Sequence, residues 1–222
     1  MRLFQPILSG ARGGDRLFAC LGAVVGIACA VLAAMLVPLP AADLPLLVAP
    51  LGASAVLVFA VPASPLAQPW PVIGGNTLSA LVGVAVYHLL PGMMLAASVA
   101  VGAAILVMSL LRCLHPPGGA SALTAVIGSP AIHAAGFGFA LFPLALNSLA
   151  LVAVGLLFHR LSGHSYPHRT APAPPEALAA GLHLADIDAA LEDMHESFDI
   201  SRADLDALLS RAEYHAAQRG GR

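Results

Sequence analysis

The sequence predicts an all-α fold: a polytopic membrane helical bundle of six membrane segments, arranged as a 3+3 inverted repeat with broken or half helices, and a cytoplasmic helical hairpin. Hydrophobic residues make up 59% of the chain and charged residues 10%, and the mean hydropathy is +0.85, which is outside the range of water-soluble domains. Between Leu17 and His159 only Asp43 and Arg112 are charged, whereas ten of the twelve acidic residues lie from Glu176 onward. The chain therefore divides into a membrane domain and a polar tail.

The lengths of the apolar runs predict which segments cross a bilayer, whose core requires about 20 helical residues. Two of the apolar runs are too short for a full crossing. Residues 46–61 are interrupted by Pro50 and Gly52, and a helix from Pro116 to Ile127 is about 18 Å long against about 30 Å of hydrocarbon. We interpret these two as broken or half-membrane helices. The runs long enough to span are 17–37, 72–90, 93–111 and 137–158, and the regular helix of 72–90 is expected to start near Gly75-Asn76.

An internal repeat relates the two halves of the membrane domain, about 17–90 and 93–160. Pro50-Leu51-Gly52-Ala53-Ser54-Ala55-Val56 is similar to Pro117-Gly118-Gly119-Ala120-Ser121-Ala122-Leu123, and Asn76-Thr77-Leu78-Ser79 is similar to Asn147-Ser148-Leu149-Ala150. Because each half has three segments, an odd number, the second copy is inserted upside down relative to the first. This inverted repeat is found in many channels and transporters. Chance similarity among small residues common in membrane helices is the alternative reading.

The arginines predict the orientation, because short cytoplasmic loops are enriched in positive charge. Arg12 and Arg16 precede the first span, within the N-terminal segment 1–16; Arg112 follows the fourth and Arg160 follows the last. Six crossings place all four arginines in the cytoplasm, together with both termini, whereas four crossings would move Arg112 outside.

Helices that begin inside a membrane leave backbone N–H groups unpaired at their positive ends, and such ends attract small anions. The residues around the breaks also have alternative roles. The hydroxyls of Ser54, Ser121 and Thr124 could serve helix packing. Asn76 and Asn147 could each cap a broken segment, and His115 could anchor the chain at the membrane interface. The candidate substrate-binding or pore residues around the breaks are Ser54, Asn76, His115, Gly118, Gly119, Ser121, Thr124 and Asn147, and the residues that shape the breaks are Pro50, Gly52, Pro116 and Pro117.

Several other classes of function lack sequence support. The chain has no lysine and no basic patch interleaved with aromatic residues, so we expect no nucleic-acid partner. The three cysteines lack CxxC spacing, and His159, His164 and His168 are too loosely spaced to predict a metal site. No intramembrane carboxylate or nucleophile–base pair is present, so we expect neither an enzyme nor a cofactor.

The stretch His115-Pro116-Pro117-Gly118-Gly119-Ala120-Ser121-Ala122-Leu123 resembles the signature of the HPP family of integral membrane proteins, and the similarity extends over most of residues 10–160. The resemblance implies a small membrane domain. Plant chloroplast relatives are implicated in nitrite transport, and many bacterial relatives are fused to paired CBS domains. It thus implies a multi-pass protein of the bacterial inner membrane whose substrate is a small monovalent inorganic anion.

The tail is predicted to be a separate cytoplasmic unit. Residues 161–180 form a Pro/Ala-rich linker, and 181–222 carry apolar residues at helical spacing, which predicts two helices. Ser201 and Asp204 have the spacing of a capping box. This stretch resembles the connector that precedes CBS domains in bacterial HPP proteins. Because an amphipathic hairpin has to bury its apolar face, we expect it to dock under the membrane domain or on a second subunit, as a homodimer.

Two functions remain open at this stage. The first is a channel or transporter for a small anion, nitrite-like, with its site at broken-helix N-termini near the bilayer midplane. The second is a membrane sensory module that signals through its tail without moving a solute.

Overall fold

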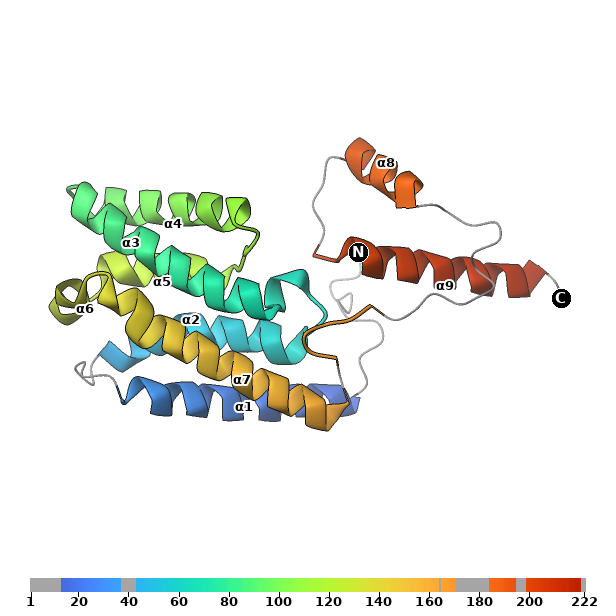
Figure 1. Cartoon of the computed structure of the whole chain (residues 1–222), viewed down its shortest axis with the longest axis horizontal. Helices are drawn as coiled ribbons and strands as arrows, with labels where there is room; N and C mark the ends of the chain where they lie inside the picture. The colour runs from blue at the N-terminus through green and yellow to red at the C-terminus, as the bar shows by residue number, and fades with distance from the viewer. Residues whose placement is uncertain (1–12, 37–42, 164, 171–183, 195–198, 221–222) are drawn as a thin grey trace, which may run out of the picture.

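The computed structural model describes residues 13–36, 43–163, 165–170, 184–194 and 199–220, and within these ranges it is helical without any β-strand. Figure 1 shows two parts: a bundle that contains α1 to α7, and α8 and α9 beyond one end of that bundle. Residues 1–12 of the predicted N-terminal segment and residues 164 and 171–180 of the predicted linker lie outside the described residues.

The elements follow the predicted segments closely. Four helices are long and apolar enough to cross a membrane, and Val48–Ala60 and Pro117–Ile127 are shorter apolar helices, so the division into four long and two short segments is confirmed. In chain order the elements are α1 (Gly13–Ala34), α2 (Leu44–Ala55), the π-helical turn η2 (Val56–Ala60), the 3-10 turn η3 (Pro65–Ala67), the π-helical turn η4 (Pro71–Gly75), α3 (Asn76–Leu89), α4 (Met93–Leu110), α5 (Pro117–Ile127), α6 (Pro130–Ala135), the π-helical turn η5 (Ala140–Ala145), α7 (Leu146–Ser162), α8 (Leu184–Met194) and α9 (Arg202–Gly220).

The loops alternate between the two ends of the bundle (Figure 1). At one end Trp70 Nε1 donates to the Leu111 carbonyl oxygen at 3.2 Å, which joins the α2–α3 and α4–α5 links. At the other end Ser129 Oγ donates to Asp43 Oδ2 at 2.7 Å, which joins the start of α2 to the start of α6. We call the first of these the tail end, because α8 and α9 lie beyond it, and the second the far end.

The second segment does not break where the sequence suggested. α2 continues through Pro50 and then widens into η2. A proline removes one helical hydrogen bond but leaves the preceding and following turns intact when neighbours re-satisfy the backbone. Gly52 meets no atom within 4 Å of an added Cβ, so no close approach explains this glycine. The prediction of a break at Pro50 and Gly52 is therefore wrong, and the irregular part of this segment is its π-helical end.

The third and last long segments share a local feature. The π-helical turn η4 ends immediately before Asn76, and the kinked turn η5, whose backbone is non-helical at Phe142, ends two residues before Asn147. The regular helix of the third segment begins at Asn76, as predicted from Gly75-Asn76. Both asparagines thus follow an irregular helical turn, and because such irregular turns occur frequently at functional sites, the two positions single out these asparagines.

Small residues allow the central helices to approach closely. An added Cβ on Gly83 of α3 would lie 2.4 Å from the Ala122 carbonyl oxygen of α5. Along α4 the buried positions recur every fourth residue, at Ala96, Ala100 and Ala104, so α4 packs against α3 and α5 through a seam of small side chains. Close helix contact through small residues is typical of membrane bundles, where van der Waals packing replaces the hydrophobic driving force.

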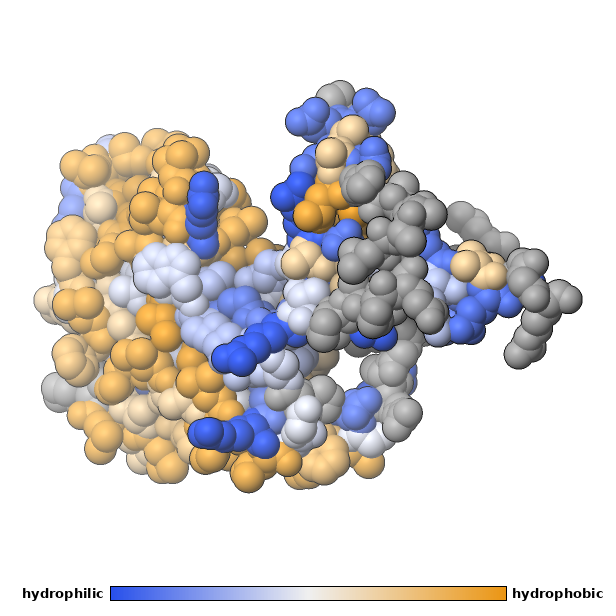
Figure 2. Space-filling model, turned by 45° about the vertical axis from the view of Figure 1, so that its right-hand side comes forward, coloured by the Kyte–Doolittle hydropathy of each residue, from blue (hydrophilic) through white to orange (hydrophobic). Residues whose placement is uncertain are grey.

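The outer surface of the bundle is apolar, as expected for a protein whose solvent is lipid. Figure 2 shows hydrophobic residues over the bundle and hydrophilic residues over the tail. The most exposed large apolar side chains of the bundle are Leu17, Val24, Leu36, Leu89, Met94, Leu110 and Leu161. Together with the apolar helices, this surface identifies the chain as an integral membrane protein.

The two helices predicted in the tail are present. Ser201 precedes α9, and its Oγ accepts from the Asp204 backbone N–H at 3.1 Å, which is the predicted N-terminal cap. Arg202 pairs with Asp188 of α8, and Ile187 of α8 is buried. No group of three potential metal-ligating residues occurs in the ranges that the structure describes.

The close α3–α5 contact generates a stability prediction. Replacing Gly83 with Ala forces the two helices apart, and we expect a loss of about 1–3 kcal/mol, the usual cost of overpacking a core. Thermal unfolding in detergent micelles measures this loss as a lower midpoint. Gly102→Ala on α4 is the matched control, because an added Cβ there meets no atom within 4 Å. Equal midpoints for the two variants would show that the contact is not rigid.

A candidate intramembrane polar site

Four polar side chains form a continuous hydrogen-bonded chain inside the bundle, and it ends on a backbone carbonyl. All four side chains have an exposed fraction of 0%. Four of the predicted site residues, brought together from α2, α3, α5 and the α4–α5 link, make up this buried polar chain. Its hydrogen bonds are Ser121 Oγ to Asn76 Oδ1 at 2.8 Å, Asn76 Nδ2 to Ser54 Oγ at 3.2 Å, Ser54 Oγ to His115 Nε2 at 2.8 Å and His115 Nδ1 to the Leu66 carbonyl oxygen at 2.8 Å.

The Leu66 carbonyl sets the direction of every hydrogen bond in the buried polar chain. A carbonyl oxygen only accepts, so Nδ1 of His115 carries the proton and Nε2 of the neutral ring accepts. Ser54 then donates its only hydroxyl proton to Nε2, which is closer than the Pro50 carbonyl at 3.2 Å, and accepts from Nδ2 of Asn76. The amide oxygen of Asn76 consequently faces Ser121, which donates to it. The chain thus runs in one direction from Ser121 to Leu66, and each member is satisfied without any charge.

Glycines bring the backbone close to this chain. An added Cβ on Gly75 would lie 2.6 Å from His115 Cβ, and one on Gly118 would lie 2.7 Å from Ser79 Oγ. A methyl group at either position would displace the helix start or the histidine. Gly118 is therefore a point of close backbone approach, whereas Gly119 has only an ordinary contact, with Val101 Cγ1 at 3.8 Å.

The start of α5 differs from the predicted anion site. The Gly118 N–H donates to the His115 carbonyl at 2.8 Å, and the Gly119 N–H donates to the Pro116 carbonyl at 3.1 Å. These two amides are already paired and are not free to hold an anion. Thr124 likewise donates to the carbonyl of Ala120 in its own helix, at 2.9 Å. Donors for a ligand therefore have to come from side chains elsewhere in the bundle.

A second group of buried polar atoms has no hydrogen-bond partner. Both amide atoms of Asn147 are in this group, and the exposed fraction of Asn147 is 0%. A buried polar atom without a partner costs about 1–3 kcal/mol, and its presence usually indicates a water or ligand that the site receives. The other members are Thr77 Oγ1, Ser79 Oγ and Ser148 Oγ.

Both asparagines lie at the same level of the bundle, between two apolar clusters. Val72 and Leu151 pack in one cluster, and Ala80 and Leu144 pack in another. Residues 76–79 of α3 lie between Val72 and Ala80, and residues 147–148 of α7 lie between Leu144 and Leu151. The partnered chain around Asn76 and the unpartnered atoms of α3 and α7 therefore belong to one layer, which we call the polar layer.

The polar layer is closed in this structure. Every member of the buried polar chain is fully inaccessible, as are Asn147 and Ser148. A cavity of about 320 Å³ lies between α1 and η2, lined by residues that include Arg16, Cys20 and Phe59, and it contains no residue of the polar layer. Access from either side of a membrane consequently requires a change of conformation.

Sequence reasoning missed several members of the site. The carbonyl of Leu66 has no sequence signature, because any loop residue carries one. Thr77, Ser79 and Ser148 were visible as part of the repeated Asn-Thr-Leu-Ser and Asn-Ser-Leu-Ala stretches. Their residue types, one and three positions after a matched asparagine, are the signal that could have identified them.

Comparison with known proteins assigns the membrane domain to a family. Residues 10–167 match the family described as "HPP, transmembrane region", which covers most of the chain and the whole polar layer. The chain belongs to the HPP family. The resemblance seen in the His115-Pro116-Pro117-Gly118-Gly119 stretch is thereby confirmed.

Two proteins similar to this chain are transmembrane proteins of Dictyostelium discoideum. One is 37% identical over 131 residues, which are 57% of this chain and 46% of the relative. The other is 37% identical over 114 residues, which are 50% of this chain and 36% of the relative. The chain thus spans less than half the length of these relatives. No solved structure matches the chain.

The buried polar chain generates a second stability prediction. His115→Ala leaves the Leu66 carbonyl and the Asn76–Ser54 end of the chain without their partner, so we expect a loss of about 1–3 kcal/mol. Thermal unfolding in detergent is the measurement, with His88→Ala as control because His88 is an exposed histidine of the same domain. A midpoint for His115→Ala that equals the control would contradict the assigned hydrogen bonds.

Proposed function

We propose that this HPP protein moves a small monovalent anion, such as nitrite, across a membrane, and that the polar layer is its binding site. The observation that carries the proposal is the group of unpartnered donors on α3 and α7. Asn147 Nδ2 and the hydroxyls of Thr77, Ser79 and Ser148 supply hydrogen-bond donors without a counter-charge. Hydrogen bonds from such donors replace those that the anion loses with its hydration water, since a buried charge is tolerated only when it is hydrogen-bonded.

The electrostatics of the polar layer favour a single negative charge. Between Leu17 and His159 the charged residues are Asp43 and Arg112, and Asp43 is hydrogen-bonded at the far end of the bundle. The layer therefore has no carboxylate that would repel an anion. It also has no lysine or arginine to neutralise a divalent anion, whose desolvation costs far more than that of a monovalent one.

The inverted repeat, which belongs to this proposal, is supported by matched local structure. Besides the irregular helical turns before Asn76 and Asn147, each half has a Ser-Pro turn after its short helix. Ser64 Oγ accepts from the Leu66 N–H at 3.1 Å, and Ser129 Oγ accepts from the Ala131 N–H at 3.2 Å. Each of these serines also donates to an aspartate. Ser64 lies at the tail end and Ser129 lies at the far end, as two copies of opposite orientation require.

The same proposal places six crossings in the membrane. Arg16, Arg112 and Arg160 all belong to the tail end of the bundle, at the start of α1, in the α4–α5 link and at the end of α7. The positive-inside rule then assigns the tail end to the cytoplasm. We retain the bacterial inner membrane and the homodimer as part of the proposal, with the exposed apolar faces of α1 and α4 open to lipid or to a second copy.

A second candidate is a sensory module that signals through its tail without transport. The observation that favours it is the contact between the tail and the α2–α3 link, where Ser64 Oγ donates to Asp199 at 2.8 Å. Purified protein in liposomes separates the two functions. Permeability to nitrite, nitrate, formate or chloride above that of empty vesicles supports transport, and no permeability to any of the four supports the sensory module.

Two substitutions test the polar layer directly. Asn147→Leu removes unpartnered amide atoms, so we expect it to abolish nitrite flux in liposomes while raising the free energy of unfolding by about 1–3 kcal/mol. Asn76→Leu is the matched comparison, because it removes an amide that holds Ser54 and Ser121, and it should lower stability. Wild-type flux in Asn147→Leu would remove this residue from the pathway.

A further inference from the structure

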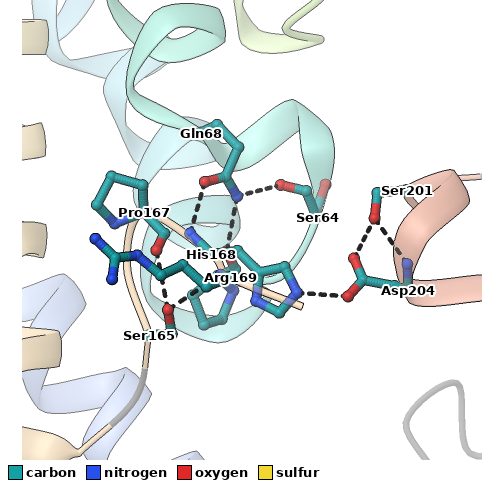
Figure 3. Close-up of polar contacts among 9 residues, drawn as sticks. Ser64, Gln68, Ser165, Pro167, His168, Arg169, Ser201 and Asp204 are labelled. Atoms are coloured by element: carbon teal, nitrogen blue, oxygen red, sulfur yellow. Dashed lines mark hydrogen bonds and ion pairs between the residues drawn. The ribbon is translucent and has the colours of Figure 1, made fainter. Parts of the chain in front are cut away.

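The loop of residues 64–68 touches both the buried polar chain and the C-terminal tail. We propose that docking of the tail on this loop holds the polar layer closed, so that release of the tail raises anion flux. This inference rests on the proposed function and adds a means of its regulation. Figure 3 shows part of the contact, in which Asp204 of the tail meets the His168 ring and the His168 backbone meets Gln68 of the loop.

The first anchor joins the tail to the loop through Ser64. Its Oγ, on a residue with an exposed fraction of 4%, lies 2.8 Å from Asp199 Oδ1 and 3.0 Å from Oδ2. The same oxygen accepts from the Leu66 N–H at 3.1 Å, and the Leu66 carbonyl accepts from His115 at 2.8 Å. Leu66 thus links the tail to the buried polar chain. Its N–H donates to the serine that binds the tail carboxylate, and its carbonyl accepts from His115 at the end of the polar chain.

The second anchor runs through Gln68. Its Nε2 donates to the carbonyl of Ser64 at 2.8 Å, which closes the loop on itself, and its Oε1 accepts from the His168 N–H at 2.9 Å. The His168 ring in turn donates from Nε2 to Asp204 Oδ1 at 2.7 Å. The two anchors therefore flank Leu66 on its two sides, and both end on carboxylates at the start of α9.

Asp204 is suited to this contact. Burial alone would raise the pKa of its carboxyl, but hydrogen bonds from Ser201 and His168, together with the charge of His168, outweigh burial and lower the pKa. The carboxylate is therefore ionised in the docked state, where hydrogen bonds to a charged group are stronger than neutral ones.

The segment after α7, residues 165–170, also holds the loop of residues 64–68 in place. Tyr166 is buried and its Oη donates to the Ala67 carbonyl at 2.9 Å. The carbonyls of Leu66 and Ala67 are thus both occupied, one by the polar chain and one by this segment. Because the loop is held at Ser64, Leu66, Ala67 and Gln68, His115 has a rigid partner only while these contacts persist. Loss of the tail removes the Ser64–Asp199 contact and takes away the Asp204 carboxylate that holds His168 beside Gln68, which leaves the polar chain free to open.

The experiment compares two variants in liposomes loaded with nitrite. The double variant Asp199→Ala/Asp204→Ala removes both carboxylates that end the anchors. The control Arg202→Ala breaks the pair with Asp188, which joins α9 to α8 and does not touch the loop. We expect the double variant to conduct nitrite at least about fivefold faster than wild type, the low end of typical allosteric coupling, and Arg202→Ala to match wild type. Flux in the double variant that is equal to or lower than that of the control would overturn the proposal.

A second readout separates this inference from the transport proposal. Hydrogen exchange of the 66–68 backbone amides, measured on the full chain in nanodiscs, should be at least about fivefold faster in the double variant than in Arg202→Ala. Unchanged exchange would contradict coupling between tail and loop whatever the flux. Faster exchange in a protein that conducts no anion in any form would overturn the transport proposal, and with it the control of flux, but not the mechanical link.

Discussion

The hydrogen bond from His115 Nδ1 to the Leu66 carbonyl oxygen, 2.8 Å long, is the interaction on which the interior of the bundle depends. A carbonyl cannot donate, so this contact fixes the tautomer of the histidine, the hydroxyl of Ser54 and the amide orientation of Asn76 in turn. It also attaches a loop at the tail end to helices that meet inside the membrane. In a low-dielectric interior, where each unmade hydrogen bond is costly, such a chain has one favourable arrangement.

The polar layer combines a satisfied half with an unsatisfied half. The side chains around Asn76 pair with one another, whereas Asn147 and Ser148 are buried without partners. The two asparagines occupy matched positions after irregular helical turns, so the difference lies in what surrounds them and not in their local backbone. An unsatisfied half retained at a cost in stability is expected where a ligand completes the hydrogen bonding, and this is why the account places the anion beside Asn147.

Much of this arrangement could be predicted from the sequence, because the physics involved is local. The lengths of the apolar runs predicted the membrane segments, Gly75-Asn76 predicted the start of the third regular helix, and Ser201 with Asp204 predicted the cap of α9. The break at Pro50 was predicted wrongly, since a helix inside a bundle tolerates proline when its neighbours supply the packing.

The parts that the sequence could not predict depend on tertiary contact. Asn76 and Asn147 read alike in the sequence, and only the fold shows that one is partnered and the other is not. The Leu66 carbonyl carries no side-chain signature at all. The tail was expected to bury its apolar face, whereas the contacts that dock it on the loop are polar, through Asp199 and Asp204.

Ligand-dependent stability of the purified protein tests the central claim most directly. A ligand that binds the folded state alone raises the free energy of unfolding by about 2.7 kcal/mol at a hundred times its dissociation constant. We expect nitrite to raise the unfolding midpoint of wild type and to leave that of Asn147→Leu unchanged, because leucine cannot donate to the anion. An equal rise in both proteins, or none in wild type at concentrations that saturate flux, would show that the anion does not bind in the polar layer.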